Sequence, residues 1–514
     1  MIPLYILLAI PCIVVSSIYA WKFLNWAWFT PKKLEKSLRQ QGFIGNPYKF
    51  LLGDLNEITK MEKEALSKPI SFSDDFLPRI MPFVHKTLAN HGKNSLVWFG
   101  TDPTVFIWDH DKIREIMSKP LVFRKPSNPA GETLARGLVS YEGDKWAKHR
   151  RLINPAFHLE KIKKMPTSFY MSCCDMLSEW EKMVPSDGAF ELDIWPSLET
   201  LTSDAISRTA FGSSYEQGRK IFELQKELAG LLLKSTISFF IPGFRYLPTR
   251  TNRRMSHIRN EVESLLLDLI NKRMKAIEAG EAITDNLLDM LLESNFKEMQ
   301  QNGNKFGMSL QDVVEECKLF YIAGQETTSA LLVWTMILLS KHSDWQARAR
   351  EEIRGAFVGG RQPDFEGLNG LKVVTMILDE VLRLYTPVFM VVRKTHKETV
   401  IGDWRVPAGV NLILPSLEVH HDRGIWGDDA KEFKPERFSE GVLKATGGRL
   451  TYFPFGWGPR MCIGQNFAIL EAKMALAMML QRYSFELSPS YSHAPTSVLF
   501  LQPQHGAHLV LRRL

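Results

Sequence analysis

The chain has 514 residues, of which 45% are hydrophobic, and a formal net charge of +7. This composition supports a large buried core, and the absence of a basic tract with interleaved aromatic residues argues against nucleic-acid binding. Five cysteines without a Cys-x-x-Cys pair favour neither a disulfide framework nor a zinc site, and indicate a reducing compartment. The modest positive charge favours an acidic protein partner and anionic lipid headgroups.

Residues 1–29 are predicted to form an N-terminal transmembrane helix. Residues 2–21 carry no charge, which is about the length that spans a bilayer. An aromatic belt follows, and basic residues then gather on the C-terminal side only, which predicts a cytosolic main body. A cleaved signal peptide is the competing interpretation, but no positive residue precedes the apolar run. We expect Thr30-Pro31 to end this helix and residues 30–50 to form a turn-rich tether.

The remaining residues, 51–514, are predicted to form one large, mainly α domain with small β-sheets (α+β). Short strands are expected at 95–99, at 104–108 and in the segment 388–415, where β-branched residues are frequent. Residues 111–350 are expected to be almost entirely helical, and 302–307 to be a polar connector. Neither a Walker loop nor a Gly-x-Gly-x-x-Gly fingerprint is present, so electrons from NADPH would have to come from a partner.

One cysteine, Cys462, lies in the stretch Phe455-Gly-Trp-Gly-Pro-Arg-Met-Cys-Ile-Gly464. Gly458 and Gly464 would let the backbone wrap around the sulfur, and a helix that begins near Gly464 would place partial positive charge beside it. Arg460 could neutralise a second anion. A thiolate with an anionic neighbour fits haem, whose iron takes the sulfur and whose propionates take the arginine. A buried structural thiol is the simpler interpretation, but it does not explain the spacing.

A second motif, Ala323-Gly-Gln-Glu-Thr-Thr328, lies in a long apolar helix expected over about 310–340. Gly324 costs this helix about 1 kcal/mol relative to alanine, and its missing side chain would let a ligand approach closely. Thr327 shares a face with Ala323 and could hold a water or dioxygen, with Glu326 as the acid. In the alternative interpretation the small residues make a helix contact and Thr328 bonds back to its own backbone.

These motifs resemble those of the haem-thiolate monooxygenases, the cytochrome P-450 superfamily, over roughly residues 40–514. The resemblance implies a single haem domain with haem b bound through Cys462, dioxygen as co-substrate and a membrane-bound NADPH–cytochrome P-450 reductase as electron donor. It implies that Thr327 and Glu326 deliver protons. It also places Phe455, Arg460 and Gly464 in the haem-binding loop.

Further haem-site and structural residues follow from the same resemblance. Trp146 and Arg150, one helical turn apart, and Arg393 match propionate-binding positions. A Glu-x-x-Arg helix and a distant arginine match a structural triad behind the haem, formed here by Glu380, Arg383 and Arg437.

The basic residues around Trp146 are open to two interpretations. They could form a solvated helix face, a docking site for an acidic electron donor, or both. These residues are Lys145, Lys148, His149 and Arg151.

Several stretches, including Trp26–Pro31, Arg208–Tyr215 and Phe485–Tyr491, resemble plant cytochrome P-450 family seventy-two, subfamily A. Tyr385-Thr-Pro387 departs from the usual Tyr-Pro-Pro of that family. The resemblance implies a single-pass protein of the endoplasmic reticulum membrane that oxidises a plant terpenoid in specialised metabolism. A triterpenoid is favoured over an iridoid or a gibberellin.

The expected substrate site is large and mostly apolar. Four stretches, 127–138, 231–244, 388–392 and 497–501, should meet above the haem if the family fold holds. An isomerase or dehydratase that rearranges peroxides and a haem-based sensor or storage protein are the alternative functions. The intact Glu326-Thr327 pair disfavours both. The exact substrate and the carbon oxidised do not follow from the sequence.

Overall fold

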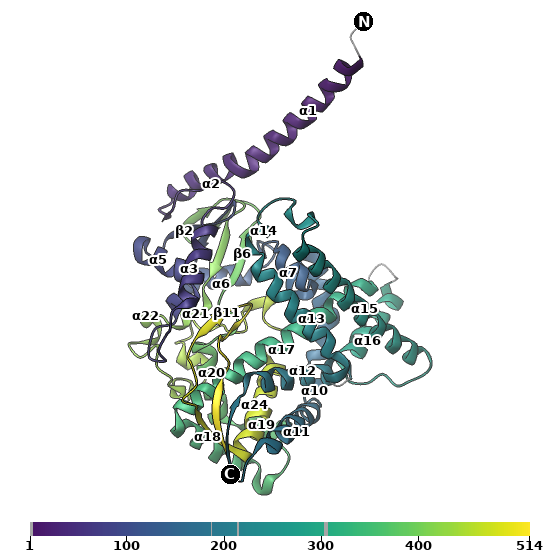
Figure 1. Cartoon of the computed structure of the whole chain (residues 1–514), viewed down its shortest axis with the longest axis vertical. Helices are drawn as coiled ribbons and strands as arrows, with labels where there is room; N and C mark the ends of the chain where they lie inside the picture. The colour runs from purple at the N-terminus through teal and green to yellow at the C-terminus, as the bar shows by residue number, and fades with distance from the viewer. Residues whose placement is uncertain (1–3, 187, 213–214, 303–306) are drawn as a thin grey trace.

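A 32-residue helix, α17 (Leu310–Lys341), runs through the middle of the molecule (Figure 1). Its N-terminus is a capping box, in which the Ser309 hydroxyl accepts from the Asp312 N–H and the Asp312 carboxylate accepts from the Ser309 N–H. Most of its side chains are buried because other helices pack on several of its faces. The predicted apolar helix is thus confirmed, within a residue or two at each end.

The structure is a computed structural model that describes residues 4–186, 188–212, 215–302 and 307–514. The expected polar connector at 302–307 therefore lies mostly outside the described residues. Helices dominate the described chain. The longer ones are α3 (Leu55–Ser67), α5 (Pro82–His91), α6 (His110–Ser118), α9 (Gly143–Ile153), α11 (Pro166–Met183), α12 (Trp195–Phe211), α13 (Tyr215–Lys234), α15 (Arg250–Glu278), α16 (Leu287–Asn302), α18 (Ser343–Ala356), α20 (Lys372–Leu384) and α24 (Gln465–Arg482).

Shorter helices connect these elements. They are α4 (Leu77–Ile80), α7 (Pro129–Leu134), α8 (Gly137–Ser140), α10 (Leu159–Ile162), α14 (Thr236–Phe239), α19 (Phe365–Gly370), α21 (Ser416–His420), α22 (Arg423–Trp426), α23 (Val442–Ala445) and the 3-10 segments η2 (Asn154–Phe157), η3 (Phe244–Tyr246), η4 (Val358–Gly360), η5 (Pro435–Phe438) and η6 (Gly458–Arg460).

The β-structure is confined to small sheets, as predicted. The largest is mixed and has the strand order β1-β2-β3-β9-β6-β4. Its strands are β1 (Ile44–Gly45), β2 (Ser95–Phe99), β3 (Asp102–Phe106), β4 (Phe123–Arg124), β6 (Val391–Thr395) and β9 (Asn411–Leu414). The others are β10 (Tyr483–Leu487) with β13 (His508–Arg513) and β5 (Ala189–Asp193), and the hairpins β11 (Pro495–Ser497) with β12 (Leu501–Pro503) and β7 (Thr399–Ile401) with β8 (Trp404–Val406).

The N-terminal helix α1 (Leu4–Leu24) projects away from the body (Figure 1). Our expectation that the helix ends at Thr30-Pro31 is wrong. It continues through a π-helical turn, η1 (Asn25–Phe29), into α2 (Thr30–Arg39), with Pro31 near the start of α2. Pro31 lacks the N–H that would bond the Ala27 carbonyl in an α-helix, and the Tyr48 hydroxyl donates to that carbonyl instead, at 2.6 Å.

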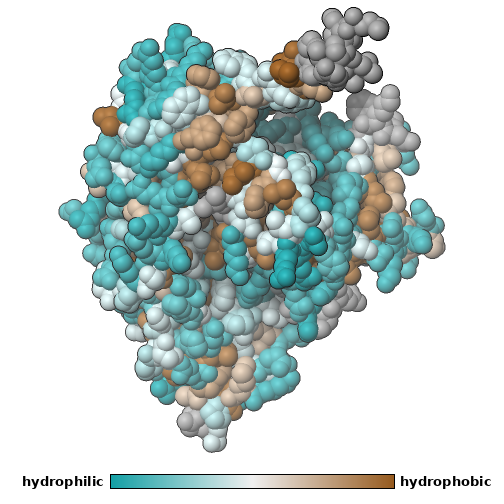
Figure 2. All heavy atoms as spheres, turned by 45° about the horizontal axis from the view of Figure 1, so that its top comes forward, coloured by the Kyte–Doolittle hydropathy of each residue, from teal (hydrophilic) through white to brown (hydrophobic). Residues whose placement is uncertain are grey.

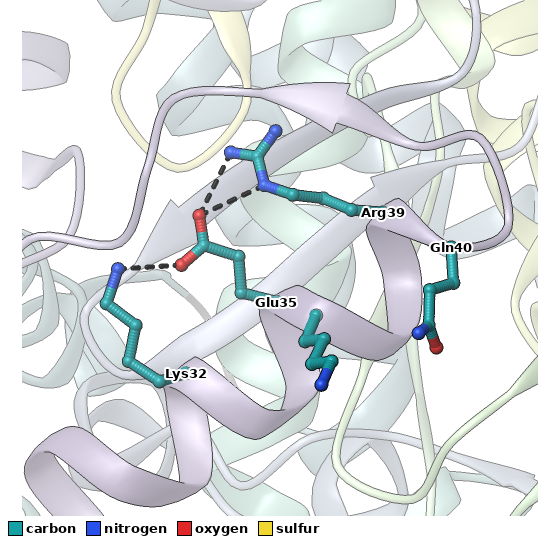
Figure 3. Close-up of a pocket in the computed structure, with 5 residues that line it drawn as sticks. Lys32, Glu35, Arg39 and Gln40 are labelled. Atoms are coloured by element: carbon teal, nitrogen blue, oxygen red, sulfur yellow. Dashed lines mark hydrogen bonds and ion pairs between the residues drawn. The ribbon is translucent and has the colours of Figure 1, made fainter.

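Helix α2 is docked on the body and forms the first part of the expected tether. Glu35 is 7% exposed and pairs with Lys32 on one side and Arg39 on the other, at 2.8 and 2.9 Å (Figure 3). These two cations hold the pKa of Glu35 below its ordinary value although burial opposes them. The domain boundaries at residues 29 and 50 remain predictions.

Apolar side chains gather at the end of the molecule from which α1 leaves (Figure 2). Trp28, Phe29 and Phe50 are each more than a third exposed there, and the rings of Trp28 and Phe50 lie 6.2 Å apart. Within the described residues, α17 is the one helix whose length and apolar composition suit a membrane span, but 78% of its most apolar window is buried in the body. The role of residues 1–29 as an anchor stays a prediction.

Candidate haem-thiolate site

The Cys462 loop is held against α9 by backbone and arginine contacts. The Cys462 N–H donates to the Phe455 carbonyl at 2.9 Å, and the Arg150 guanidinium donates to the Met461 carbonyl at 2.9 Å. The side chain of Cys462 is exposed, yet the surrounding protein is dense enough for burial to raise the pKa of its thiol. The sulfur therefore borders an internal space rather than the outer surface.

Three groups favour the thiolate over the thiol. The Gly464 N–H donates to the sulfur, and the positive charges of Arg150 and Lys125 lower the thiol pKa further, against the effect of burial. Helix α24 begins at Gln465, directly after this loop, as predicted, and its expected apolar face (Phe467, Leu470, Met474 and Met478) is buried. The loop is thus built to hold a sulfur anion at a helix N-terminus.

Gly458 has the backbone freedom that we expected, and Gly464 does not use it. Gly456 and Gly458 have φ values of 72° and 73°, which glycine adopts without strain, and a Cβ at Gly458 would lie 2.8 Å from the Met117 carbonyl oxygen. Gly464 has φ −88° and needs no such freedom. Its contribution is the backbone N–H, which donates to the Cys462 sulfur.

Positive side chains from four segments surround the approach to Cys462. Arg460 is 4% exposed, pairs with Glu142 at 2.6 Å and stacks over the Trp146 ring at 4.1 Å. Arg393, on β6, is 5% exposed and has its pKa lowered by burial and then by the charge of Arg460. The predicted propionate residues Trp146, Arg150, Arg393 and Arg460 are therefore brought together from α9, β6 and the cysteine loop.

Sequence reasoning missed Lys125, which belongs to the same group. It follows β4, donates to the Val139 carbonyl at 2.6 Å and has its pKa lowered to about 7 by burial, then by Arg393 and Arg460. Glu142 pairs with Arg460, and it is the carboxylate whose negative charge raises the pKa values of Lys125 and Arg393. We call these three cations with Glu142 the cationic cradle. Its excess positive charge fits the two propionates of a haem.

The basic face that we considered on helix α9 is only partly exposed. His149 is fully buried and bonds Glu316 of α17 at 2.6 Å. Lys145 pairs with Asp312, Lys148 donates to the Gly307 carbonyl, and Arg151 pairs with Glu298. These basic residues fix α9 against α16 and α17, and each has a partner within the chain. Lys145 and Arg151 stay exposed, so a docking site for an electron donor on this face remains a prediction.

On α17, Thr327 and Ala323 keep accessible side chains on an otherwise buried helix. The Thr327 hydroxyl donates to the Ala323 carbonyl at 2.7 Å, so the back-bonding that we weighed for Thr328 occurs at Thr327. Its oxygen can still accept a hydrogen bond. Burial raises the pKa of Glu326 to about 7, with a smaller contribution from Glu199. This carboxyl can therefore release and take up a proton near neutral pH.

Gly324 faces α12 rather than a ligand. A Cβ at this position would lie 2.7 Å from the Ile206 side chain, so the glycine allows α12 to pack closely on α17. The neighbouring contact, in which the Thr202 hydroxyl donates to the Gln325 carbonyl at 3.1 Å, fixes the same helix pair. Helix packing therefore explains the missing side chain of Gly324, and its contact with the cofactor stays a prediction.

Glu380 and Arg383 form a fully buried, bidentate ion pair with both distances at 2.8 Å. Arg383 also donates to the carbonyls of His420, Ala430 and Glu432, and the Lys434 N–H donates to Glu380. Arg437 lies 3.5 Å from Glu380. The three residues are thus in contact, although their assignment as a triad behind the haem stays a prediction.

The comparisons with known proteins agree with this geometry. The cytochrome P450 family model matches residues 79–510. The chain belongs to the cytochrome P450 family. It is 58% identical to cytochrome P450 CYP72A219 of Panax ginseng, over 98% of this chain and 97% of that protein. It is 52% identical to secologanin synthase 1 of Catharanthus roseus, over 96% of this chain and 95% of that protein.

A third relative, cytochrome P450 72A397 of Kalopanax septemlobus, is 58% identical over 96% of both chains. The resemblance to plant family seventy-two, subfamily A, is therefore confirmed. The chain is a cytochrome P450 monooxygenase, and this family uses haem with thiolate ligation, dioxygen and electrons from a redox partner. The residues around Cys462 fit that cofactor.

Proposed function

We propose that this cytochrome P450 is a membrane-anchored enzyme that hydroxylates a plant terpenoid, with a triterpenoid favoured over an iridoid or a gibberellin. The main observation in favour of haem binding is the cationic cradle beside Cys462. Its three cations have one carboxylate among them, so an anionic ligand would balance their charge. The relation to a secologanin synthase supports a terpenoid as the substrate.

In this proposal Cys462 binds the haem iron, and haem supplies the activation of dioxygen when it is bound. Arg460, Arg393, Lys125 and Arg150 with Trp146 hold and orient the propionates. Thr327 accepts a hydrogen bond from a water, and Glu326, with its pKa near 7, supplies protons to this position. Electrons come from a membrane-bound NADPH-dependent flavoprotein reductase.

The apolar stretches expected above the haem support a large, dry substrate site. Helix α7 contacts both α13 and α14, which brings 127–138 beside 231–244. The Leu501 N–H donates to the Pro387 carbonyl at 3.0 Å, which brings 497–501 beside 388–392. Phe239, Phe389, Leu499 and Phe500 are half-buried, which suits side chains that pack against an apolar skeleton.

The test is expression of the full chain with a plant reductase, followed by a carbon-monoxide difference spectrum and a panel of terpenoids. A terpenoid substrate should shift the ferric haem toward its high-spin spectrum and yield a hydroxylated product that depends on NADPH. Turnover of fatty acids or phenolics alone would reject the substrate class and leave the monooxygenase assignment intact. A haem protein without NADPH-dependent turnover would support the sensor or storage alternative.

Localisation in the endoplasmic reticulum membrane, with the haem domain in the cytosol, is proposed from α1 and its flanking charges. Two truncations test it. Removal of residues 1–24 should shift the protein toward the soluble fraction and leave haem binding intact. Removal of residues 1–29 also deletes Ala27 and Trp28, which contact Tyr48, and should lower the stability of the soluble protein. A 1–24 deletion that stays in membranes as firmly as the full chain would contradict the anchor.

A further inference from the structure

A cavity of about 530 Å³ lies on the outer side of the Cys462 loop. It is bounded by α10, α19, α20, the segment 452–457 and the first turns of α24. None of its lining residues belongs to α17 or to the four apolar stretches expected above the haem. It is therefore separate from the proposed substrate site.

The walls of this cavity are largely apolar. Leu159 and Met461 are 51% and 41% exposed, and Phe365, Trp457 and Ile469 are half-buried. A partly enclosed space of this volume with an apolar lining and a few polar groups has the character of a small-molecule site.

Lys473 of α24 lines the cavity and is only 5% exposed. No hydrogen bond or ion pair joins its ammonium to another described residue, and burial lowers its pKa. Lys318, which is similarly buried, pairs with Glu315 at 3.0 Å. A buried ammonium without a partner is costly, so an acceptor in the cavity would be stabilised there.

Asp379 is the other charged lining residue. Its carboxylate accepts from the Tyr452 hydroxyl at 3.1 Å, and it forms no ion pair with Lys473. Burial raises the pKa of Asp379 to about 6, against the Tyr452 hydrogen bond and the charge of Lys473. The side chains of Gln465 and Asn466, which also line the cavity, add amide donors. The donors of Lys473 therefore remain available to a ligand.

We propose that this cavity binds a small amphipathic carboxylate, with its head on Lys473 and its apolar skeleton against Leu159, Phe365 and Trp457. A fatty acid and a terpenoid acid share this chemistry. Dodecanoate and abietate are the two probes that distinguish these sources, with dodecyltrimethylammonium as the probe of opposite charge.

The experiment measures binding heats on the full-length, haem-loaded protein with the substrate side blocked by clotrimazole, an azole that coordinates the haem iron. Dodecanoate, abietate or both should bind, and the ammonium probe should bind more weakly. Because the signal is heat from a protein whose substrate side is closed, the result does not depend on the proposed terpenoid oxidation.

Two variants locate the site. Lys473→Met should weaken carboxylate binding at least about tenfold, the loss expected for one charge-assisted hydrogen bond. Leu159→Trp fills the cavity from an exposed position and should also abolish binding. Lys63→Met, which removes the same charge from an exposed position on α3, away from the residues that line the cavity, is the matched control and should bind normally.

Carboxylate binding that both Lys473→Met and Leu159→Trp leave unchanged would overturn the proposal. Preferential binding of the ammonium probe, lost in Asp379→Asn, would overturn it as well, because the cavity would then recognise a cation. If Lys473→Met fails to fold, the Leu159→Trp result decides alone.

Discussion

Two cationic sites inside this protein differ in whether the chain itself satisfies their positive charge. Arg383 has a bidentate carboxylate and three carbonyls as partners, and its side chain is fully buried. The cationic cradle combines Arg460, Arg393 and Lys125 with one carboxylate, Glu142. The first group is electrostatically closed, and the second carries excess positive charge that a ligand must balance.

The difference separates architecture from binding. Substitutions in the closed group should lower the free energy of unfolding, because they leave a buried charge without its partner whether or not a ligand is bound. Changes around the open group should leave the fold in place and alter the cofactor or the chemistry. This contrast can be tested with single substitutions.

The largest effect is expected at the closed pair. Glu380→Gln removes the carboxylate charge and leaves Arg383 uncompensated, which should cost about 3–5 kcal/mol of the free energy of unfolding. Denaturant unfolding of the purified protein measures the loss. Glu160→Gln, which breaks the exposed pair with Lys163 at the same i, i+3 spacing, is the control and should change stability little. If the two variants were equally stable, the Glu380–Arg383 pair would not have the structural role that we assign to it.

Cys462→Ser should change the cofactor signature without unfolding the domain. The thiolate-type Soret band of the reduced carbon-monoxide complex should disappear, because an alcohol oxygen does not donate electron density as a thiolate does. Thermal unfolding of the body should remain cooperative and close to that of the unmodified chain. Retention of the thiolate-type band in this variant would show that another group ligates the iron.

Thr327→Ala should leave haem binding intact and reduce the product formed per NADPH by at least about tenfold, with the remaining electrons released as peroxide. The reason is the partly accessible side chain of Thr327 on α17, with the acid Glu326 adjacent in the chain. Thr328→Ala, at a buried position one residue later, is the matched control. Tight coupling of NADPH use to product in Thr327→Ala would reject this role.

A pH dependence of stability is expected at Lys125. Its pKa is about 7 in the folded chain, below the ordinary 10.5, so between these values the unfolded chain binds more protons. Stability of the haem-free protein should therefore rise with pH from about 7 to 10.5 through this group. Lys125→Met should flatten that rise, and haem should reduce the difference by placing carboxylates beside the ammonium. Identical pH profiles for both haem-free proteins would contradict the assignment of Lys125 to the cradle.

The residues within a single segment are enough to predict many of the helices, strands and motifs of this protein. The helix at 310–341, the helix that follows Gly464 and the strand at 95–99 depend on apolar periodicity and glycine placement within the segment itself. The Cys462 loop was recognisable because its chemistry is concentrated in ten consecutive residues. The contact of Glu380 with Arg383 follows from one helical turn.

Other features depend on residues that are distant in sequence. Lys125 has no motif of its own and joins the site only because β4 pairs with β6, which carries Arg393. Gly324 is explained by Ile206 on another helix, and the basic residues of α9 by carboxylates on α16 and α17. The helix passes through Pro31 because Tyr48 replaces the missing donor.

The sequence by itself therefore determined the fold class, the cysteine loop and the long helix with its acid and threonine, since each is encoded by neighbouring residues. Only the tertiary structure decided which cations are satisfied and which await a ligand. Burial and charge balance are sums over side chains from separate segments, and the sequence does not state which segments meet.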